Sequence, residues 1–278
     1  MDDSRILILG ASGRVGGILR RAWPEADHVL WQTRGAVPGP GWARLDPLAE
    51  PEALARAAQG RAAILCLAGV TPARAAAGAE MADNVALAEA AVRVGAAAGA
   101  RVMLASSAAV YGQRAGLLDE EMPPAPVSDY GRAKAEMEAR AIELGTDLGV
   151  RVCSLRIGNI AGSDAILGGW RPGFTLDRFA DGRTPRRSYI GPESLARVLA
   201  ALLAAPDLPG VLNLAAPGAV EMGALLDAAG LDWTPRPAPA AAIPEVRLSV
   251  ARLARIVPLA ESDGQPAALV ADWRRMQD

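Results

Sequence analysis

Histidine and cysteine are scarce in this chain, and their scarcity excludes several kinds of site. Among 278 residues there are one histidine, His28, and two cysteines, Cys66 and Cys153, which lie far apart in the sequence. A zinc or other transition-metal site needs several such ligands close together, so we expect no metal site. Each cysteine lies in an apolar, strand-like run, where a reduced thiol packs as a small hydrophobic group. We therefore expect both thiols in the core.

Long apolar runs and an excess of one charge are also missing. The longest apolar stretch, around Ala62 to Val70, is much too short to cross a bilayer. A net charge of −2 gives no electrostatic reason to expect nucleic acid or an anionic membrane as a partner. The first residues lead directly into Arg5-Ile-Leu-Ile-Leu without the layout of a signal peptide. We expect a cytoplasmic protein that binds neither nucleic acid nor membrane.

The chain does contain short apolar runs that alternate with alanine-rich, helix-compatible segments. This alternation is typical of βαβ units that build a parallel sheet, and runs that are apolar throughout indicate strands covered on both faces. A short strand is expected before Asp46, and the other predicted strands are Ile6–Leu9, His28–Gln32, Ala63–Leu67, Val102–Ser106, Val152–Ile157 and Val211–Leu214. Helices are expected to start near Arg14, Pro51, Asn84, Ser128 and Glu193.

A glycine-rich turn directly follows the first predicted strand and opens a helix. In such a turn the first glycine permits the tight bend, the second allows a pyrophosphate to approach the backbone, and the third lets helix and strand pack closely. The helix N-terminus then offers N–H groups and a positive dipole end to the phosphates. The candidate cofactor contacts here are Gly10, Ser12, Gly13, Arg14, Val15 and Gly16, with Leu67 and Ala68 after the fourth strand.

The end of the second predicted strand bears on the choice of dinucleotide. NAD enzymes usually carry an acid there for the ribose 2′-hydroxyl, whereas NADP enzymes often carry an arginine for the 2′-phosphate. This chain reads Trp31-Gln-Thr-Arg34 and has no acid at that point. The predicted cofactor is therefore NADP, held by Arg34, with NAD as the alternative. Asp46 is a candidate adenine contact or, equally, the N-cap of the following helix.

The composition changes after Gly162, which indicates a second, smaller lobe. Residues 163–187 are rich in Gly, Pro and Arg, and a proline-rich linker, Pro235 to Pro244, precedes the C-terminal tail. We predict an α/β fold, a Rossmann-like doubly wound parallel sheet with a small discontinuous C-terminal substrate lobe. The dinucleotide-binding domain would comprise residues 1–162 completed by 188–216, and the lobe residues 163–187 and 217–278.

The segment from Ser128 to Lys134 carries the strongest chemical signal. On a helix, Tyr130 and Lys134 are four residues apart and share a face. A phenol has a pKa of about 10 and is a poor base at neutral pH, so we expect the nearby ammonium to lower that pKa toward the working range. Tyr130 could then exchange a proton with an alcohol or carbonyl oxygen while a hydride leaves or reaches the carbon.

A serine pair lies at the carboxyl end of the predicted strand Val102–Ser106. Ligands of open α/β sheets bind beyond these strand ends, so a hydroxyl of Ser106 or Ser107 can orient the substrate oxygen beside the tyrosine. A strand-end turn or a helix cap is the alternative role for such a pair.

Together these motifs resemble the extended short-chain dehydrogenase/reductase family, which includes nucleotide-sugar epimerases, dehydratases and keto-reductases. The resemblance runs from Arg5 to about Leu214, and more loosely to the C-terminus. Besides the glycine turn, its most specific pieces are Ser-Ser-Ala-Ala-Val-Tyr111-Gly, Pro126 through Tyr130 to Lys134, and Leu155-Arg-Ile-Gly-Asn159-Ile-Ala-Gly162. Arg14 and Arg34 depart from the family pattern, which usually has an aromatic residue and an acid at these positions.

The resemblance implies roles for several residues. In that family the catalytic hydroxyl lies four residues before the tyrosine of the Tyr-Gly pair, which selects Ser107. Lys134 would also bind the nicotinamide ribose, and Asn84 would support the active-site helix or a proton path. Asn159 matches a position that often contacts the substrate or its phosphate.

An arginine-rich stretch extends from Trp170 to Arg187. It precedes Ser188-Tyr-Ile-Gly-Pro, which is similar to the family's segment where an arginine meets the substrate phosphate. This match makes Arg187 the candidate, with Asn159 on the opposite wall. A guanidinium can hold a carboxylate or phosphate with two parallel hydrogen bonds, so we expect an anionic substrate. The alternative is a solvated basic loop, partly balanced by Asp164, Asp177 and Asp181.

The predicted function is an NAD(P)-dependent oxidoreductase or epimerase that acts on an alcohol or carbonyl carbon of a small anionic substrate. The alternative is a non-catalytic dinucleotide sensor on the same fold, because fold alone does not imply activity. Ser107, Tyr130 and Lys134 are all present, which favours the enzyme. The expected partner is a small-molecule substrate, and a homodimer is left open.

Overall fold

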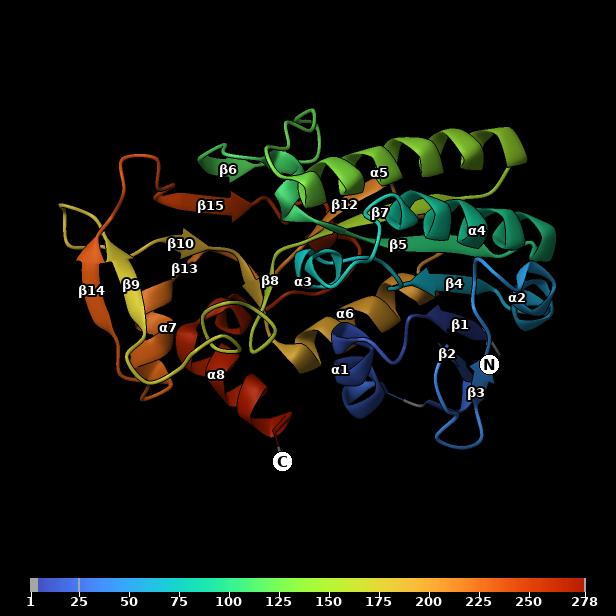
Figure 1. Cartoon of the computed structure of the whole chain (residues 1–278), viewed down its shortest axis with the longest axis horizontal. Coiled ribbons are helices and arrows are strands. Elements are labelled where there is room, and N and C mark those ends of the chain that lie inside the picture. The colour runs from blue at the N-terminus through green and yellow to red at the C-terminus, as the bar shows by residue number, and fades with distance from the viewer. Residues whose placement is uncertain (1–4, 25, 278) are drawn as a thin grey trace.

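A seven-stranded parallel sheet forms the centre of the protein in the computed structural model, which describes residues 5–24 and 26–277. The strand order is β12-β7-β5-β4-β1-β2-β3 (Figure 1). The strands are β1 Ile6–Leu9, β2 Val29–Thr33, β3 Trp42–Arg44, β4 Ala63–Cys66, β5 Arg101–Ser107, β7 Val152–Ile157 and β12 Val211–Leu214. Each predicted strand is present, with bounds that differ by one residue at most, and the predicted fold class is confirmed.

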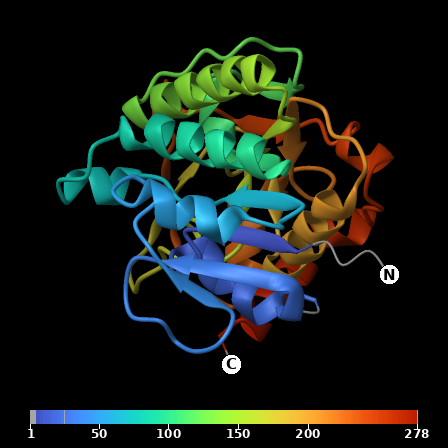
Figure 2. The same ribbon diagram turned by 90° about the vertical axis from the view of Figure 1, so that its right-hand side faces the viewer.

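Helices cover both faces of this sheet. The first layer holds α2 Pro51–Ala58, α4 Asp83–Ala98 and α5 Asp129–Leu148; the second holds α1 Arg14–Ala22 and α6 Pro192–Ala204. Figure 2 shows the green helices α4 and α5 on one face, and the dark-blue helix α1 and the orange helix α6 on the other. The short helix α3 Pro72–Ala76 follows β4. The predicted helix starts are confirmed to within one residue, and Ser128 caps α5 by accepting the Gly131 N–H.

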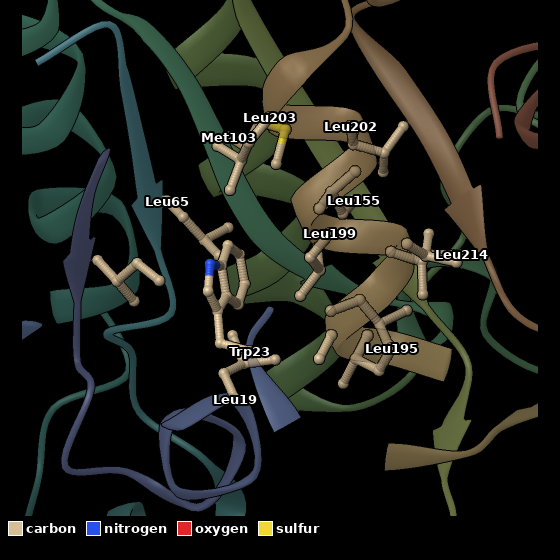
Figure 3. Close-up of a cluster of buried hydrophobic side chains, with 14 of the residues drawn as sticks. Leu19, Trp23, Leu65, Met103, Leu155, Leu195, Leu199, Leu202, Leu203 and Leu214 are labelled. Atoms are coloured by element: carbon tan, nitrogen blue, oxygen red, sulfur yellow. The ribbon is translucent and has the colours of Figure 1, made fainter. Parts of the chain in front are cut away.

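The larger part of the core lies between the sheet and helices α1 and α6 (Figure 3). Leucines recur along α6 at positions three or four apart, so one side of this helix is a continuous apolar stripe. Leu195, Leu199 and Leu202 are fully buried there. They face strand residues such as Leu155 and Leu214, which are apolar because both faces of the sheet are covered.

The second lobe is built from short strands. A four-stranded sheet has the order β13-β10-β15-β6. Two separate two-stranded sheets lie outside it: β8 pairs with β11, and β9 pairs with β14. The bounds are β6 Gly116–Leu118, β8 Asn159–Ile160, β9 Thr175–Arg178, β10 Arg186–Arg187, β11 Tyr189–Ile190, β13 Val220–Glu221, β14 Thr234–Pro237 and β15 Glu245–Leu248. Because β6 belongs to this sheet, the first half of the chain contributes to it; the division at residue 162 stays a prediction.

Two segments in the C-terminal region are more ordered than the sequence predicts. Part of the expected proline-rich linker forms β14, which pairs only with β9, so its prolines remove no hydrogen bond from a central strand. Within the expected tail, helix α8 Pro266–Arg275 packs against α6 and α7 Met222–Ala228. Asp272 on α8 accepts the backbone N–H groups of Glu193 and Ser194 at 2.9 and 3.3 Å, and so caps α6 from another helix.

Two further sequence-based expectations concern membranes and metals. Within the described ranges no helix has both the length and the apolar character that crossing a bilayer requires. In the same part of the chain, no three histidine, cysteine, aspartate or glutamate side chains gather as metal ligands would.

We predict that Cys66 and Cys153 are both free thiols in the native protein. They lie on β4 and β7 with β5 between them, and two strand spacings of about 4.8 Å exceed the reach of a disulfide, whose Cα atoms lie within about 7 Å. They also belong to core clusters on opposite faces of the sheet. Mass spectrometry after alkylation in denaturant without reductant should show two alkylated cysteines, as in a reduced control; a native intramolecular bridge would contradict this strand order.

Candidate active site

The glycine-rich turn joins β1 to α1 in a conformation that its glycines require. Gly10 has φ +78°, and a Cβ atom there would lie 2.5 Å from the backbone nitrogen of Ala68. A Cβ on Gly16 would lie 2.3 Å from the carbonyl oxygen of Ala11. The first and third glycines thus allow strand β1, helix α1 and the end of β4 to approach each other, as the sequence predicts.

The middle glycine leaves the start of helix α1 accessible. Gly13 is the N-cap residue of α1, and no side chain caps the helix there. Gly13 and its neighbours Ser12 and Arg14 are exposed, whereas Val15 packs against the core. A helix N-terminus offered to solvent through a glycine turn fits a bound pyrophosphate. Leu67 and Ala68, half-buried at the end of β4, border the same turn.

Gln32 supports this glycine turn, although its sequence position does not single it out. Its side-chain oxygen accepts the Gly10 N–H at 2.8 Å, and its amide nitrogen donates to the Leu45 carbonyl at 2.6 Å. Gln32 is almost fully buried and therefore links the ends of β1, β2 and β3. Its signal in the sequence is a polar residue at the end of the apolar run Val29-Leu-Trp.

Arg34 and Asp46 lie together beyond the ends of β2 and β3. Their closest approach is 3.5 Å between Nη1 and Oδ2, and the Arg34 side chain is 59% exposed. Asp46 does not cap α2, whose N-cap is Glu50, so the capping alternative is wrong. Its Oδ1 instead accepts the backbone N–H groups of Leu48 and Ala49, which hold the pKa of the carboxyl below its usual value.

Arg14 connects the glycine turn to the loop that follows β8. Its Nη1 donates to the Ser163 carbonyl at 2.9 Å. The guanidinium therefore reaches the second lobe, and its predicted contact with the cofactor stays a prediction.

Ser107 and Tyr130 meet at the carboxyl end of the central sheet. Ser107 is the last residue of β5 and caps the short 3₁₀ helix Ala108–Tyr111, where its Oγ accepts the Ala109 N–H at 3.2 Å. Its hydroxyl also lies beside the Tyr130 phenol from the first turn of α5, where its interaction with the phenol opposes the effect of burial on the Tyr130 pKa. The side chain of Ser106 points elsewhere and donates to Glu138. The structure thus brings the phenol to Ser107, the serine that the family resemblance selects.

Lys134 lies one turn further along α5 and is buried. Its Nζ donates to the Ala105 carbonyl at 2.7 Å and lies 5.9 Å from the centroid of the Tyr130 ring. Burial lowers the pKa of this ammonium to about 8, and its interactions with Cys66 and Glu138 only partly oppose the shift. Lys134 is the only lysine in the chain, which otherwise uses arginine for its positively charged side chains.

The expected lowering of the Tyr130 pKa is wrong. Burial raises the pKa of the phenol above its usual value, and its interaction with Ser107 only partly opposes that effect. The physical reason is that the cost of burying the phenolate outweighs the interactions that favour it, while the Lys134 ammonium donates to a backbone carbonyl.

Asn84 ties the loop after β4 to helix α4. Its Oδ1 accepts the Val70 N–H at 3.2 Å, and its Nδ2 donates to the carbonyls of Val70 and Met81 at 3.1 and 3.0 Å. A Cβ on Gly69 would lie 2.7 Å from Asn84 Oδ1 and 3.2 Å from Lys134 Nζ. Gly69 therefore lets Asn84 and Lys134 approach each other directly beside Ala68 of the cofactor cradle.

Asn159 and Arg187 lie around Tyr189 on neighbouring short strands. Asn159 on β8 and Tyr189 on β11 are register partners, and their side chains are hydrogen-bonded. The Tyr189 hydroxyl donates to Asp164 at 2.8 Å, and Arg187, two residues earlier in the chain, donates through Nη1 to the Arg186 carbonyl at 2.8 Å. Arg187 is half-buried, and burial lowers its pKa. The two predicted substrate contacts thus belong to one polar cluster.

This fold and the arrangement of these residues are those expected of an α/β oxidoreductase with a dinucleotide-binding glycine turn. A sequence profile of the NAD dependent epimerase/dehydratase family matches residues 6–215. The chain therefore belongs to the NAD dependent epimerase/dehydratase family and is an enzyme of that family, as the sequence predicts. No curated protein sequence matches the chain.

Solved structures of the same fold are distant in sequence. A UDP-glucose-4-epimerase from Stenotrophomonas maltophila, with bound NAD and formylated UDP-arabinopyranose, has a TM-score of 0.81 at 17% identity and covers 99% of this chain and 98% of its own. MoeE5 with UDP-glucuronic acid and NAD has a TM-score of 0.73 at 21% identity and covers 97% of this chain and 99% of its own. DesIV, a dTDP-glucose 4,6-dehydratase from Streptomyces venezuelae with NAD bound, has a TM-score of 0.72 at 23% identity and covers 98% of this chain and 97% of its own. At these identities the similarity shows the fold.

We predict that the two neighbouring serines respond differently to alanine. Ser107→Ala removes the hydroxyl beside Tyr130 and should lower kcat more than Ser106→Ala does, with little change in Tm. Ser106→Ala removes a buried donor to Glu138 and should cost about 1–3 kcal/mol of folding free energy. Thermal unfolding and turnover of both variants test this. Greater loss of activity in Ser106→Ala would show that Ser107 is not the catalytic serine.

Proposed function

We propose that the protein transfers a hydride between a nicotinamide dinucleotide and the hydroxyl- or carbonyl-bearing carbon of a small anionic substrate similar to a sugar nucleotide. The observation that carries this proposal is that the Ser107 hydroxyl and the Tyr130 phenol meet beside the glycine turn. The two sites adjoin, because Gly10 packs on Ala68 and the next residue, Gly69, packs on Lys134. When bound there, the dinucleotide supplies the hydride acceptor or donor.

The proton chemistry falls to this chain's own side chains. Tyr130 would take the proton from a substrate hydroxyl, or return one to a carbonyl oxygen, through its phenolic oxygen. Ser107 would hold that substrate oxygen beside the phenol. Lys134, fixed by the Ala105 carbonyl with its Nζ 5.9 Å from the centre of the same ring, would hold the ribose of the nicotinamide.

A panel of sugar nucleotides tests the proposed activity. UDP-glucose, UDP-glucuronic acid and dTDP-glucose, each with NAD and with NADP, should include a substrate that is epimerised, dehydrated or oxidised, as observed by proton NMR of the products.

Tyr130→Phe keeps the ring and removes the proton carrier, so kcat should fall about 10²–10⁴-fold while cofactor affinity stays near that of the wild type. Retention of a third of the activity would exclude Tyr130 as the acid–base group.

The cofactor we propose is NADP in preference to NAD. Support comes from Arg34, which follows β2 where no acid is present, and from its largely exposed guanidinium, which a 2′-phosphate can reach. The solved structures described above hold NAD, so the preference is specific to this chain.

Titration of both cofactors by tryptophan fluorescence tests the preference. The wild type should bind NADP more tightly, and Arg34→Ala should abolish the difference by weakening NADP binding alone. Arg56 is an exposed arginine on α2, and the matched control Arg56→Ala should keep the preference for NADP. Equal or tighter binding of NAD by the wild type would refute the proposal.

We propose that Arg187 and Asn159 bind the anionic end of the substrate. Arg187 is half-buried in the cluster around Tyr189, so an anion there would meet a partly desolvated guanidinium. Arg187→Ala should raise KM for the substrate found in the panel at least about tenfold, with cofactor affinity unchanged. Arg183→Ala removes an exposed arginine paired with Asp181 and should change neither. An unchanged KM in Arg187→Ala would remove this residue from the substrate site.

A further inference from the structure

A row of buried polar side chains crosses three neighbouring strands beneath helix α5. Ser106 on β5 is the register partner of Arg156 on β7, and Arg156 is the partner of Asn213 on β12. Their exposed fractions are 4%, 3% and 0%. The row lies at the carboxyl end of the sheet, directly before Ser107. None of these three side chains belongs to the catalytic centre described above.

Glu138 on α5 covers this row from above. Its two carboxylate oxygens accept from Arg156 Nε at 3.2 and 3.1 Å, and Oε2 also accepts from Nη2 at 2.8 Å. The Ser106 hydroxyl donates to the same carboxylate. Both charged side chains are 4% exposed, so water screens the pair very little.

Another N–H group of Arg156 bonds to the tyrosine that ends the Ser-Ser-Ala-Ala-Val-Tyr motif. Arg156 Nη1 donates to the Tyr111 hydroxyl at 3.0 Å, and that hydroxyl donates to Asn213 Oδ1 at 2.8 Å. A buried polar network in which each group has a partner is rigid and specifies one arrangement. The network therefore joins α5, β5, β7 and β12 at one level of the sheet.

The spacing along α5 connects this network to the catalytic residues. Tyr130, Lys134 and Glu138 are each four residues apart and so lie along one side of the helix. Lys134 donates to the carbonyl of Ala105, and Glu138 accepts from the hydroxyl of Ser106, the next residue of β5. Two successive turns of α5 thus hold two successive residues of β5, and the residue after them is Ser107.

We propose that Glu138 is a positioning residue, which through Arg156 and Ser106 fixes where helix α5 lies along strand β5 and so places Tyr130 and Lys134 beside Ser107. The inference rests on the proposed roles of these three residues. The neighbouring contacts of α5 are apolar: Met137 and Ala141 pack against the cluster that contains Val102 and Leu104. Apolar contacts are non-directional, whereas the planar Arg156–Glu138 fork has one favourable geometry.

The charges around Lys134 support the same role. The titratable groups that face its ammonium are Glu138 from its own helix, the Tyr130 ring, and Cys66 from β4; Asn84 from α4 is neutral. Burial raises the pKa of the Cys66 thiol to about 11, so this thiol is uncharged at neutral pH. Glu138 is then the negative group that opposes the effect of burial on Lys134.

The single lysine makes a direct test possible without a substrate. Protein labelled with [¹³Cε]lysine has one lysine side chain, so one NMR signal followed against pH reports the titration of Lys134. The variants are Glu138→Gln, the paired Glu138→Met/Arg156→Met, which removes both charges, and Glu143→Gln, an exposed control on the same helix. Thermal unfolding of each variant is measured in parallel.

The expected result separates positioning from stability. Glu138→Gln should lower both Tm and the Lys134 midpoint, the midpoint by roughly one unit, because it removes a nearby opposite charge. The paired variant leaves no unpaired buried charge, so its Tm should recover while its midpoint stays low. With any substrate from the panel, both variants should lose kcat with KM unchanged, and Glu143→Gln should match the wild type.

One result would overturn the proposal. If the paired variant has the wild-type Lys134 midpoint and wild-type kcat, Glu138 contributes to folding alone. If Glu138→Gln does not fold, the paired variant carries the test. Because the titration requires no turnover, its outcome is independent of whether the sugar-nucleotide panel contains a substrate, so a failure of this inference is distinguishable from a failure of the proposed function.

Discussion

Helix α5 meets the central sheet through the buried ion pair of Glu138 and Arg156, and the candidate catalytic groups depend on that contact. Removing two charges from water is expensive, so such a pair adds little net stability compared with apolar side chains of the same size. Its contribution here is geometric. Arg156 is the register partner of Ser106, the residue before the end of β5, and Ser107 and Tyr130 meet just beyond it. An apolar contact in the same place would leave the helix freer to slide along the strand.

The two ends of the active site are built in different ways. At the cofactor end, the backbone does most of the work: Gly10 packs on Ala68, Gly16 packs on Ala11, and buried Gln32 joins three strand ends. These contacts fix a shape that suits a dinucleotide and depends little on the substrate. At the substrate end, Asn159, Tyr189 and Arg187 come from strands of only two residues, whose side chains form a polar cluster. Under the proposed function, a change in these side chains would alter substrate binding and leave the glycine turn as it is.

Much of the fold and part of the site could be predicted because the signals are local. Apolar runs covered on both faces identify the strands, and the glycine turn is identified by the spacing of Gly10, Gly13 and Gly16 together with its place between the first strand and a helix. Tyr130 and Lys134 are found in the same way, because four residues on a helix define a shared face. The missed features all involve partners far apart in sequence: Gln32 with Leu45, Glu138 with Arg156, and Asp272 with the start of α6. The helix cap assigned to Asp46 failed because the residue that caps α2 is Glu50.

The amino-acid sequence by itself determined the class of the protein: the order of strands and helices, the dinucleotide turn and the presence of Ser107, Tyr130 and Lys134. These follow from periodicity and short spacings, which act over a few residues of chain. Only the tertiary structure decided how these groups behave. It separated the roles of Ser106 and Ser107, directed the Lys134 ammonium to a backbone carbonyl, and raised the pKa of Tyr130 through burial. Burial and charge depend on what packs around a side chain in three dimensions, and distant parts of the chain supply that packing.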